Sequence, residues 1–126
     1  MKVNTTYILG AVILAALVYY LYNLAVDSPH RISSADAKQR IQQGGFDVIL
    51  DVRTDLEVKT LGFYPGSVHI PSPEIPSKVP VQYPNKETRI LLYCNTGHRA
   101  RIATDILHKL GYKNTVYISG GYKSIL

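Results

Sequence analysis

The residues best suited to chemistry are the six from Cys94 to Arg99, which read Cys-Asn-Thr-Gly-His-Arg. Cys94 is the only cysteine in the 126 residues, so it cannot form an intrachain disulfide and is either a buried filler or a reactive thiol. Gly97 accepts the positive φ that turns neighbouring backbone N–H groups inward as an anion-binding nest. Those amides, together with Arg99 and a protonated His98, would stabilise a thiolate. The loop therefore predicts a nucleophilic cysteine.

The elements on either side of the loop should place it at a binding edge. Residues 89–93, which are apolar from Ile90 on, predict a buried strand that ends beside Cys94. Residues 100–110 carry apolar side chains at helical spacing and are followed by a glycine stop, which predicts a helix with its positive dipole end at the loop. In a parallel sheet, ligands bind outside the carboxyl ends of the strands, where Cys94 falls.

The rest of the domain follows the same alternation. Residues 47–52 and 115–118 read as further buried strands, and residues 31–32 as a short one. Residues 33–36 offer a capping serine, followed by a helix that ends at Gly44-Gly45. Strand, helix and strand in this order predict right-handed parallel crossovers and an α/β fold. Residues 71–84 hold five of the seven prolines and are expected to be irregular.

The N-terminal segment is a candidate membrane anchor. Residues 7–26 carry no charge, and about twenty residues of helix span about 30 Å, the thickness of a bilayer core. The stretch is longer than a usual signal-peptide core, and Asn23-Leu24-Ala25 is a poor cleavage site, so an uncleaved anchor is favoured over a signal peptide. We therefore expect residues 1–27 to be a transmembrane helix with its flanks and residues 28–126 to be one domain.

Charge bears on orientation and partners. Arg31, Lys38 and Arg40 follow the apolar segment, whereas Lys2 precedes it, so the positive-inside bias favours a single-pass protein with a cytoplasmic domain. The net charge of +5 suits an anionic substrate, an acidic partner or a membrane surface. No recognition motif accompanies this charge, so nucleic-acid binding is not expected.

Several motifs in the same order resemble the rhodanese family. They cover nearly all of residues 28–126 and are the D-V-R run Asp51–Arg53, then Glu57, the stretch Gly62–Pro71 that resembles G-x-I-P-G-A-x-N-I-P, the loop Cys94–Arg99, and Gly120-Gly121-Tyr122. The resemblance implies a three-layer fold with a central five-stranded parallel sheet between helices. It also implies a sulfurtransferase of the thiosulfate type, with no cofactor and no metal.

In the implied mechanism, the Cys94 thiolate takes the outer sulfur of thiosulfate or a similar small anionic donor as a persulfide and releases sulfite. A thiol, a protein acceptor or cyanide then removes that sulfur, which completes a ping-pong cycle. The resemblance assigns substrate binding to Asn95, Thr96, Gly97, His98 and Arg99, with His98 either touching the substrate or lining the mouth. Asp51 and Arg53 would support the loop, and a purely structural ion pair is an equal alternative for them.

Two other classes of function use the same kind of loop. Phosphatases and arsenate reductases of this architecture resemble Cys-x5-Arg, whereas four residues separate Cys94 from Arg99, so fewer amides could face a phosphate. A non-catalytic binding module or persulfide carrier is the second alternative, because no other cysteine could resolve a Cys94 persulfide. Since Asn95 and Thr96 add no positive charge, we expect thiosulfate to bind weakly.

Overall fold

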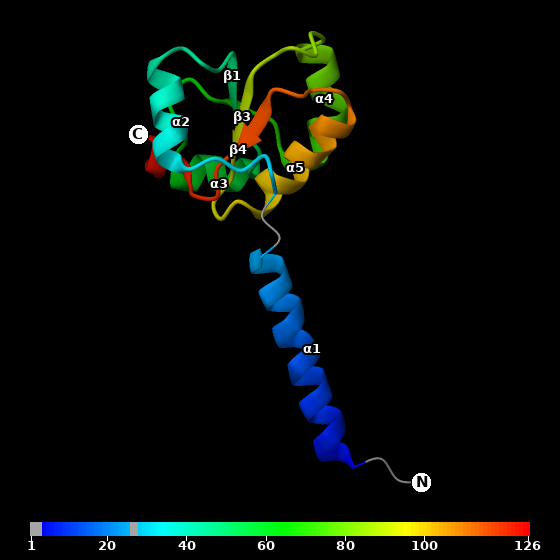
Figure 1. The fold of residues 1–126 in the computed structure, drawn as a ribbon. Helices are drawn as coiled ribbons and strands as arrows, with labels where there is room; N and C mark the ends of the chain where they lie inside the picture. Colours follow the sequence, from blue (N-terminus) through cyan, green and yellow to red (C-terminus); the bar gives the residue numbers. More distant parts are fainter. Residues whose placement is uncertain (1–3, 26–27) are drawn as a thin grey trace.

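The computed structural model describes residues 4–25 and 28–126, in which helices and strands alternate after one long N-terminal helix (Figure 1). In chain order the elements are α1 (Thr5–Ala25), α2 (Ser34–Gln42), β1 (Val48–Asp51), α3 (Asp55–Leu61), β2 (Val68–His69), the 3₁₀ helix η1 (Ser72–Glu74), α4 (Ile75–Gln82), β3 (Ile90–Tyr93), α5 (His98–Lys109), β4 (Thr115–Tyr117) and the 3₁₀ helix η2 (Tyr122–Ile125).

The strands form one parallel sheet in the order β2-β1-β3-β4, which confirms the α/β class with a parallel sheet. The expectation of five strands is wrong, because the described residues form four. Arg31 meets Tyr117 only as an isolated parallel bridge. The Tyr117 N–H donates to the His30 carbonyl at 3.1 Å, and the Ile32 N–H donates to the Tyr117 carbonyl at 2.9 Å. Ser33 then caps α2, so the chain leaves the sheet before a fifth strand can extend.

Helices cover both faces of the sheet, with α2 on one side and α4 and α5 on the other (Figure 1). Alternate residues of β3 point to the two sides, as the period of two in a strand requires. Ile90 and Leu92 join the apolar cluster that contains α4 and α5 residues, and Leu91 and Tyr93 join the cluster that contains α2 and η2 residues. Because all four side chains of β3 are buried, the strand is fixed in register and holds the loop after it in place.

The predicted helices are present, with shifted ends. Ser33 caps α2 by accepting a hydrogen bond from the Asp36 N–H at 3.0 Å, as expected. The helix after the cysteine loop begins at His98 rather than at residue 100, so Arg99 belongs to its first turn.

The expectation that residues 71–84 are irregular is wrong, since they contain η1 and α4. Pro76 lies in the first turn of α4, where no N–H is required, and Pro80 removes a single helical hydrogen bond. Ile75 and Val79 are fully buried in the cluster on the α4 and α5 side. We attribute the helix to this burial, which offsets the hydrogen bond lost at Pro80.

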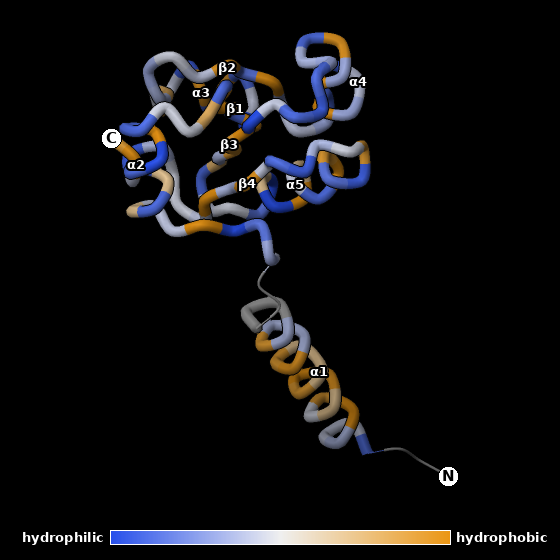
Figure 2. The backbone as a smooth tube through the Cα atoms, turned by 45° about the horizontal axis from the view of Figure 1, so that its top comes forward, coloured by the Kyte–Doolittle hydropathy of each residue, from blue (hydrophilic) through white to orange (hydrophobic). Residues whose placement is uncertain are grey.

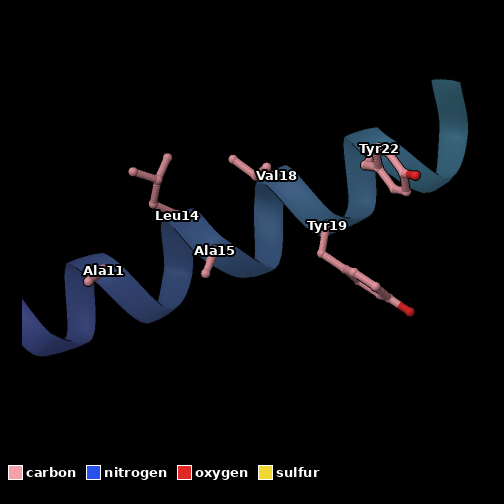
Figure 3. A pocket seen from close by; sticks show the side chains of 6 residues that line it. All are labelled: Ala11, Leu14, Ala15, Val18, Tyr19 and Tyr22. Atoms are coloured by element: carbon pink, nitrogen blue, oxygen red, sulfur yellow. The ribbon is translucent and has the colours of Figure 1, made fainter.

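Apolar residues recur along most of the N-terminal helix, between paler and more hydrophilic stretches (Figure 2). Its stretch Thr5–Tyr22 has a mean hydropathy of 1.7 and no buried residue, so its length and composition suit a membrane span and equally a signal sequence. Figure 3 shows side chains along this helix that line a shallow apolar surface, namely Ala11, Leu14, Ala15, Val18, Tyr19 and Tyr22. Val26, the last residue of the predicted span, and Asp27 and Lys2, used for the domain boundary and the orientation, lie outside the described residues.

Candidate active site

Cys94 directly follows β3 at the carboxyl edge of the sheet, as predicted, and its side chain is 1% exposed. The Gly97 backbone N–H donates a hydrogen bond to the Cys94 Sγ at 3.1 Å. Gly97 has φ +88° and is the residue from which α5 starts, so this amide and the positive end of the helix dipole both face the sulfur. An amide donor and a helix N-terminus beside a sulfur are an environment typical of reactive cysteines, and the nucleophilic role of Cys94 stays a prediction.

Gly97 is also held by the chain after β4. A Cβ atom built on Gly97 would lie 2.7 Å from the Ser119 Cα, which is closer than real Cβ atoms approach. A Cβ on Gly121 would lie 3.9 Å from the Cys94 carbonyl oxygen and 3.7 Å from that of Asn95. Residues 119–121 therefore pack directly on the loop, and glycine at position 97 is a steric requirement as well as a conformational one.

Arg99 is tied to Glu57 of α3. Its Nη1 donates to Glu57 Oε1 at 2.5 Å and its Nη2 donates to Glu57 Oε2 at 2.8 Å, so the pair is bidentate. The hydrogen bond from Arg99 lowers the pKa of Glu57 to about 2. The pKa of Arg99 is raised, first by this hydrogen bond and to a smaller extent by the attraction of Glu57 and of Cys94. The charge of Arg99 is thus already compensated by Glu57.

Asp51 and Arg53 form a second, fully buried pair at the end of β1. The Asp51 carboxylate accepts from the Arg53 backbone N–H at 3.0 Å and from its Nε and Nη2 at 2.9 and 2.6 Å. The Tyr93 hydroxyl donates to the same carboxylate at 2.8 Å. Arg53 also donates to the Gly62 carbonyl at 2.6 Å and to the Asn95 side-chain oxygen at 3.4 Å. The pair is held by these buried contacts and also touches the loop through Asn95.

The remaining predicted site residues, Asn95, Thr96 and His98, are exposed at the loop surface. Asn95 donates from its side chain to Glu57 Oε2 at 2.5 Å, which turns its amide toward α3. The side chains of Thr96 and His98 make no hydrogen bond or ion pair with the rest of residues 4–25 and 28–126. No group of three or more His, Cys, Asp or Glu side chains in these ranges could hold a metal ion.

Glu57 is the site residue to which the sequence analysis assigned no role. It binds Arg99 and Asn95, and it also forms a capping box with Thr54 at the start of α3. The Thr-x-x-Glu spacing at positions 54–57 is a recognisable signal for that cap. Its loop partners Asn95 and Arg99 are 38 and 42 residues away in sequence, so no local sequence pattern predicts these contacts.

A cysteine set between a buried parallel strand and the N-terminus of a helix is a position chemically suited to an anionic group. Residues 33–126 match the family described as the Rhodanese-like domain. The chain therefore belongs to the rhodanese-like family.

Sulfurtransferases are among its relatives. The chain is 31% identical over 87 residues to mouse thiosulfate sulfurtransferase/rhodanese-like domain-containing protein 3, covering 60% of this chain and 55% of that protein. It is 33% identical over 60 residues to the thiosulfate sulfurtransferase PspE of Escherichia coli K12, covering 48% of this chain and 57% of that protein. The chain thus spans a little over half the length of these two relatives. The human single-domain sulfurtransferase TSTD1 shares the fold, with a TM-score of 0.66, 24% identity and coverage of 77% of this chain and 95% of that one.

Proposed function

We propose that this protein is a sulfurtransferase that carries sulfane sulfur as a persulfide on Cys94. The Gly97 N–H, 3.1 Å from the Cys94 Sγ, is the observation that carries the proposal, because it stabilises the thiolate before transfer and the persulfide after it. With thiosulfate, the thiolate attacks the outer sulfur, a new S–S bond forms on Cys94, the donor S–S bond breaks and sulfite leaves. A thiol or cyanide then takes the outer sulfur and regenerates the thiolate.

Within this proposal the residues around Cys94 have different roles. The Gly97 amide, which donates to the Cys94 sulfur, would hold the transferred sulfur, and the exposed side chains of Thr96 and His98 would border the entry to the loop. Asp51 and Arg53 are positioning residues, since Arg53 contacts the Asn95 side chain rather than the sulfur. Because the chain has no second cysteine, the persulfide must pass to another molecule, so a persulfide carrier would use the same site.

We also propose that α1 is an uncleaved anchor, with residues 1–27 as the membrane segment and residues 28–126 as a cytoplasmic domain. The apolar stretch Thr5–Tyr22 and the excess of Arg and Lys after it support this arrangement. A single-pass anchor would hold the site near the membrane surface and near membrane-proximal thiol acceptors. Labelling of an added cysteine near each end of α1 in intact cells, in a Cys94→Ser background, tests the orientation.

The enzyme assay uses the full chain in detergent micelles, with thiosulfate as donor and cyanide as acceptor. Thiocyanate formation that disappears in Cys94→Ser supports the proposal, and parallel lines in double-reciprocal plots would mark the ping-pong order. A folded wild-type protein that forms no thiocyanate from thiosulfate, and none from any persulfide donor, would leave only the binding-module alternative. Phosphatase chemistry is disfavoured because Glu57 already occupies Arg99, the guanidinium that a phosphate would need.

A further inference from the structure

The segment that leads into the domain after the N-terminal helix is held against one edge of the sheet. Residues 28–32 lie beside β4 (Figure 1). The Tyr117 N–H donates to the His30 carbonyl at 3.1 Å, and the Ile32 N–H donates to the Tyr117 carbonyl at 2.9 Å. Ile32 also packs against the apolar cluster on the α2 side, whereas Arg31 is exposed. The segment is therefore fixed at Ile32 and held by fewer apolar contacts before it.

A stacked pair of histidines also joins this segment to α5. The rings of His30 and His108 are parallel within 10°, and their centroids are 3.5 Å apart. His108 Nε2 lies 2.7 Å from the Thr115 carbonyl oxygen, and because a carbonyl can only accept, this nitrogen carries the proton. The Nδ1 atom of a neutral His108 is therefore unprotonated, and a second proton would make the ring a cation.

Protonation works against this stack. Two imidazolium rings at 3.5 Å would place two positive charges face to face, which repel by a factor of about seven even in water. Burial and then His108 lower the pKa of His30 from 6.5, while Asp105 of α5 acts in the opposite direction. Asp105 also acts on Tyr117 of β4, whose other charged neighbours are Arg31 and Arg101. The stacked state thus binds protons less readily than a state in which the two rings are apart.

We propose that the stacked His30–His108 pair is a pH-sensitive latch that holds residues 28–31 on the domain and releases them on acidification. The latch is closed when both rings are neutral. Below about pH 6.5, the ordinary pKa of histidine, the separated and protonated rings become favoured. Because Ile32 stays in its cluster, release frees residues 28–31, a stretch that spans at most about 14 Å when extended.

Release would lengthen the connection between α1 and the domain, so the distance of the domain from a membrane would depend on pH. This consequence rests on the anchor proposed above. The latch itself depends neither on the anchor nor on sulfur transfer at Cys94, and the experiment that tests it measures neither. A failure of the proposed function and a failure of the latch are therefore distinguishable.

Hydrogen exchange of the full chain in detergent micelles tests the latch. The reporter is the Tyr117 amide, which is bonded to the His30 carbonyl, and the reference is the Ile90 amide, which is bonded to the Asn114 carbonyl at 3.0 Å. Each exchange rate is divided into that of an unstructured peptide at the same pH, which gives a protection factor. We expect Tyr117 to be at least about tenfold less protected than Ile90, because the segment opens without unfolding of the sheet. Between about pH 7 and 5, the protection of Tyr117 should fall roughly sevenfold.

Two variants test whether the histidine pair causes this fall. His30→Phe keeps a flat ring that can stack on His108, and a protonated His108 is attracted rather than repelled by that ring. In this variant the protection of Tyr117 should change less than about twofold over the same pH range. His98→Phe makes the same exchange at an exposed histidine of the loop after β3, and it should keep the full fall.

Three results would overturn the latch. The first is equal protection of the Tyr117 and Ile90 amides, which would mean that the segment leaves when the whole domain unfolds. The second is a protection of Tyr117 in the wild type that is the same at both pH values. The third is a fall in His30→Phe as large as that in the wild type. If His30→Phe does not fold, the first two results decide.

Discussion

Replacing Gly97 by alanine tests the geometry of the cysteine loop most sharply. Gly97 has φ +88°, and an added Cβ would meet the Ser119 Cα at 2.7 Å and the Ser119 carbonyl oxygen at 3.1 Å. A left-handed conformation costs an alanine about 1–2 kcal/mol, and pushing backbone aside costs about 1–3 kcal/mol more, which together give about 2–5 kcal/mol. Movement of residue 97 also withdraws its N–H from the Cys94 sulfur.

Gly44 offers a matched control for this substitution. It has φ +69°, but a Cβ added there would meet no atom within 4 Å, so Gly44→Ala should cost only the conformational term of about 1–2 kcal/mol. Urea unfolding of both variants, followed by tyrosine fluorescence, gives the difference between their free energies of unfolding. The rate of sulfur loading on Cys94 gives the effect of each substitution on the site. We expect Gly97→Ala to be the less stable variant and to load sulfur at least about tenfold more slowly, as when an oxyanion-hole donor is lost. Equal stability and equal loading in the two variants would refute the steric and amide-cradle reasoning.

Two further predictions concern pH. The pKa of Glu57 is lowered to about 2 by its hydrogen bond to Arg99, so its contribution to stability is complete above the ordinary value of 4.5 and is lost as the pH falls toward 2. Between pH 4.5 and 2, the free energy of unfolding of the wild type should fall by about 1 kcal/mol more than that of Glu57→Gln, after allowance for partial exposure. Urea unfolding at several pH values measures this difference. Parallel plots of unfolding free energy against pH for the two proteins would contradict the ion pair. The pKa of His30 is lowered from 6.5, first by burial and then by His108, on which its ring stacks at 3.5 Å between centroids. The stabilisation by neutral His30 is therefore present above pH 6.5 and is lost below it. In the wild type the melting temperature should fall between about pH 7 and 5, and His30→Gln should make this fall smaller. An equal fall in the variant would count against the stacked pair.

The cysteine loop was predictable because its signals are local. The apolar run at residues 90–93, the lone cysteine and Gly97 lie within eight residues, and their order predicts a strand, a tight turn and a helix. The structure has β3 at Ile90–Tyr93, the turn at Gly97 and α5 from His98. The helix starts earlier than expected because a glycine with φ +88° lets the first helical turn begin at once.

The partners of the loop side chains were not predictable from local patterns. The family resemblance assigns Arg99 to the substrate, yet its ion pair with Glu57 joins residues 42 positions apart. Such a contact depends on how α3 lies beside the loop, which hydrophobic periodicity does not specify. The roles of Thr96, Gly97 and His98 in binding a donor stay predictions.

Tertiary burial explains the errors in the fold. The prolines of residues 71–84 indicated an irregular segment, but Ile75 and Val79 are buried well enough to hold α4 together. The short strand expected at residues 31–32 is only a bridge at Arg31, because the cap of α2 at Ser33 takes the chain out of the sheet. Local propensity is a weak guide where packing and capping compete with it.

The most direct test of the central claim is the intact mass of the full chain after brief exposure to a sulfane-sulfur donor and removal of the excess. The account predicts a gain of one sulfur atom that fragmentation places on Cys94, that a thiol acceptor or cyanide removes, and that Cys94→Ser does not show. A folded wild-type protein whose mass is unchanged by both thiosulfate and an organic persulfide would contradict sulfur transfer through Cys94.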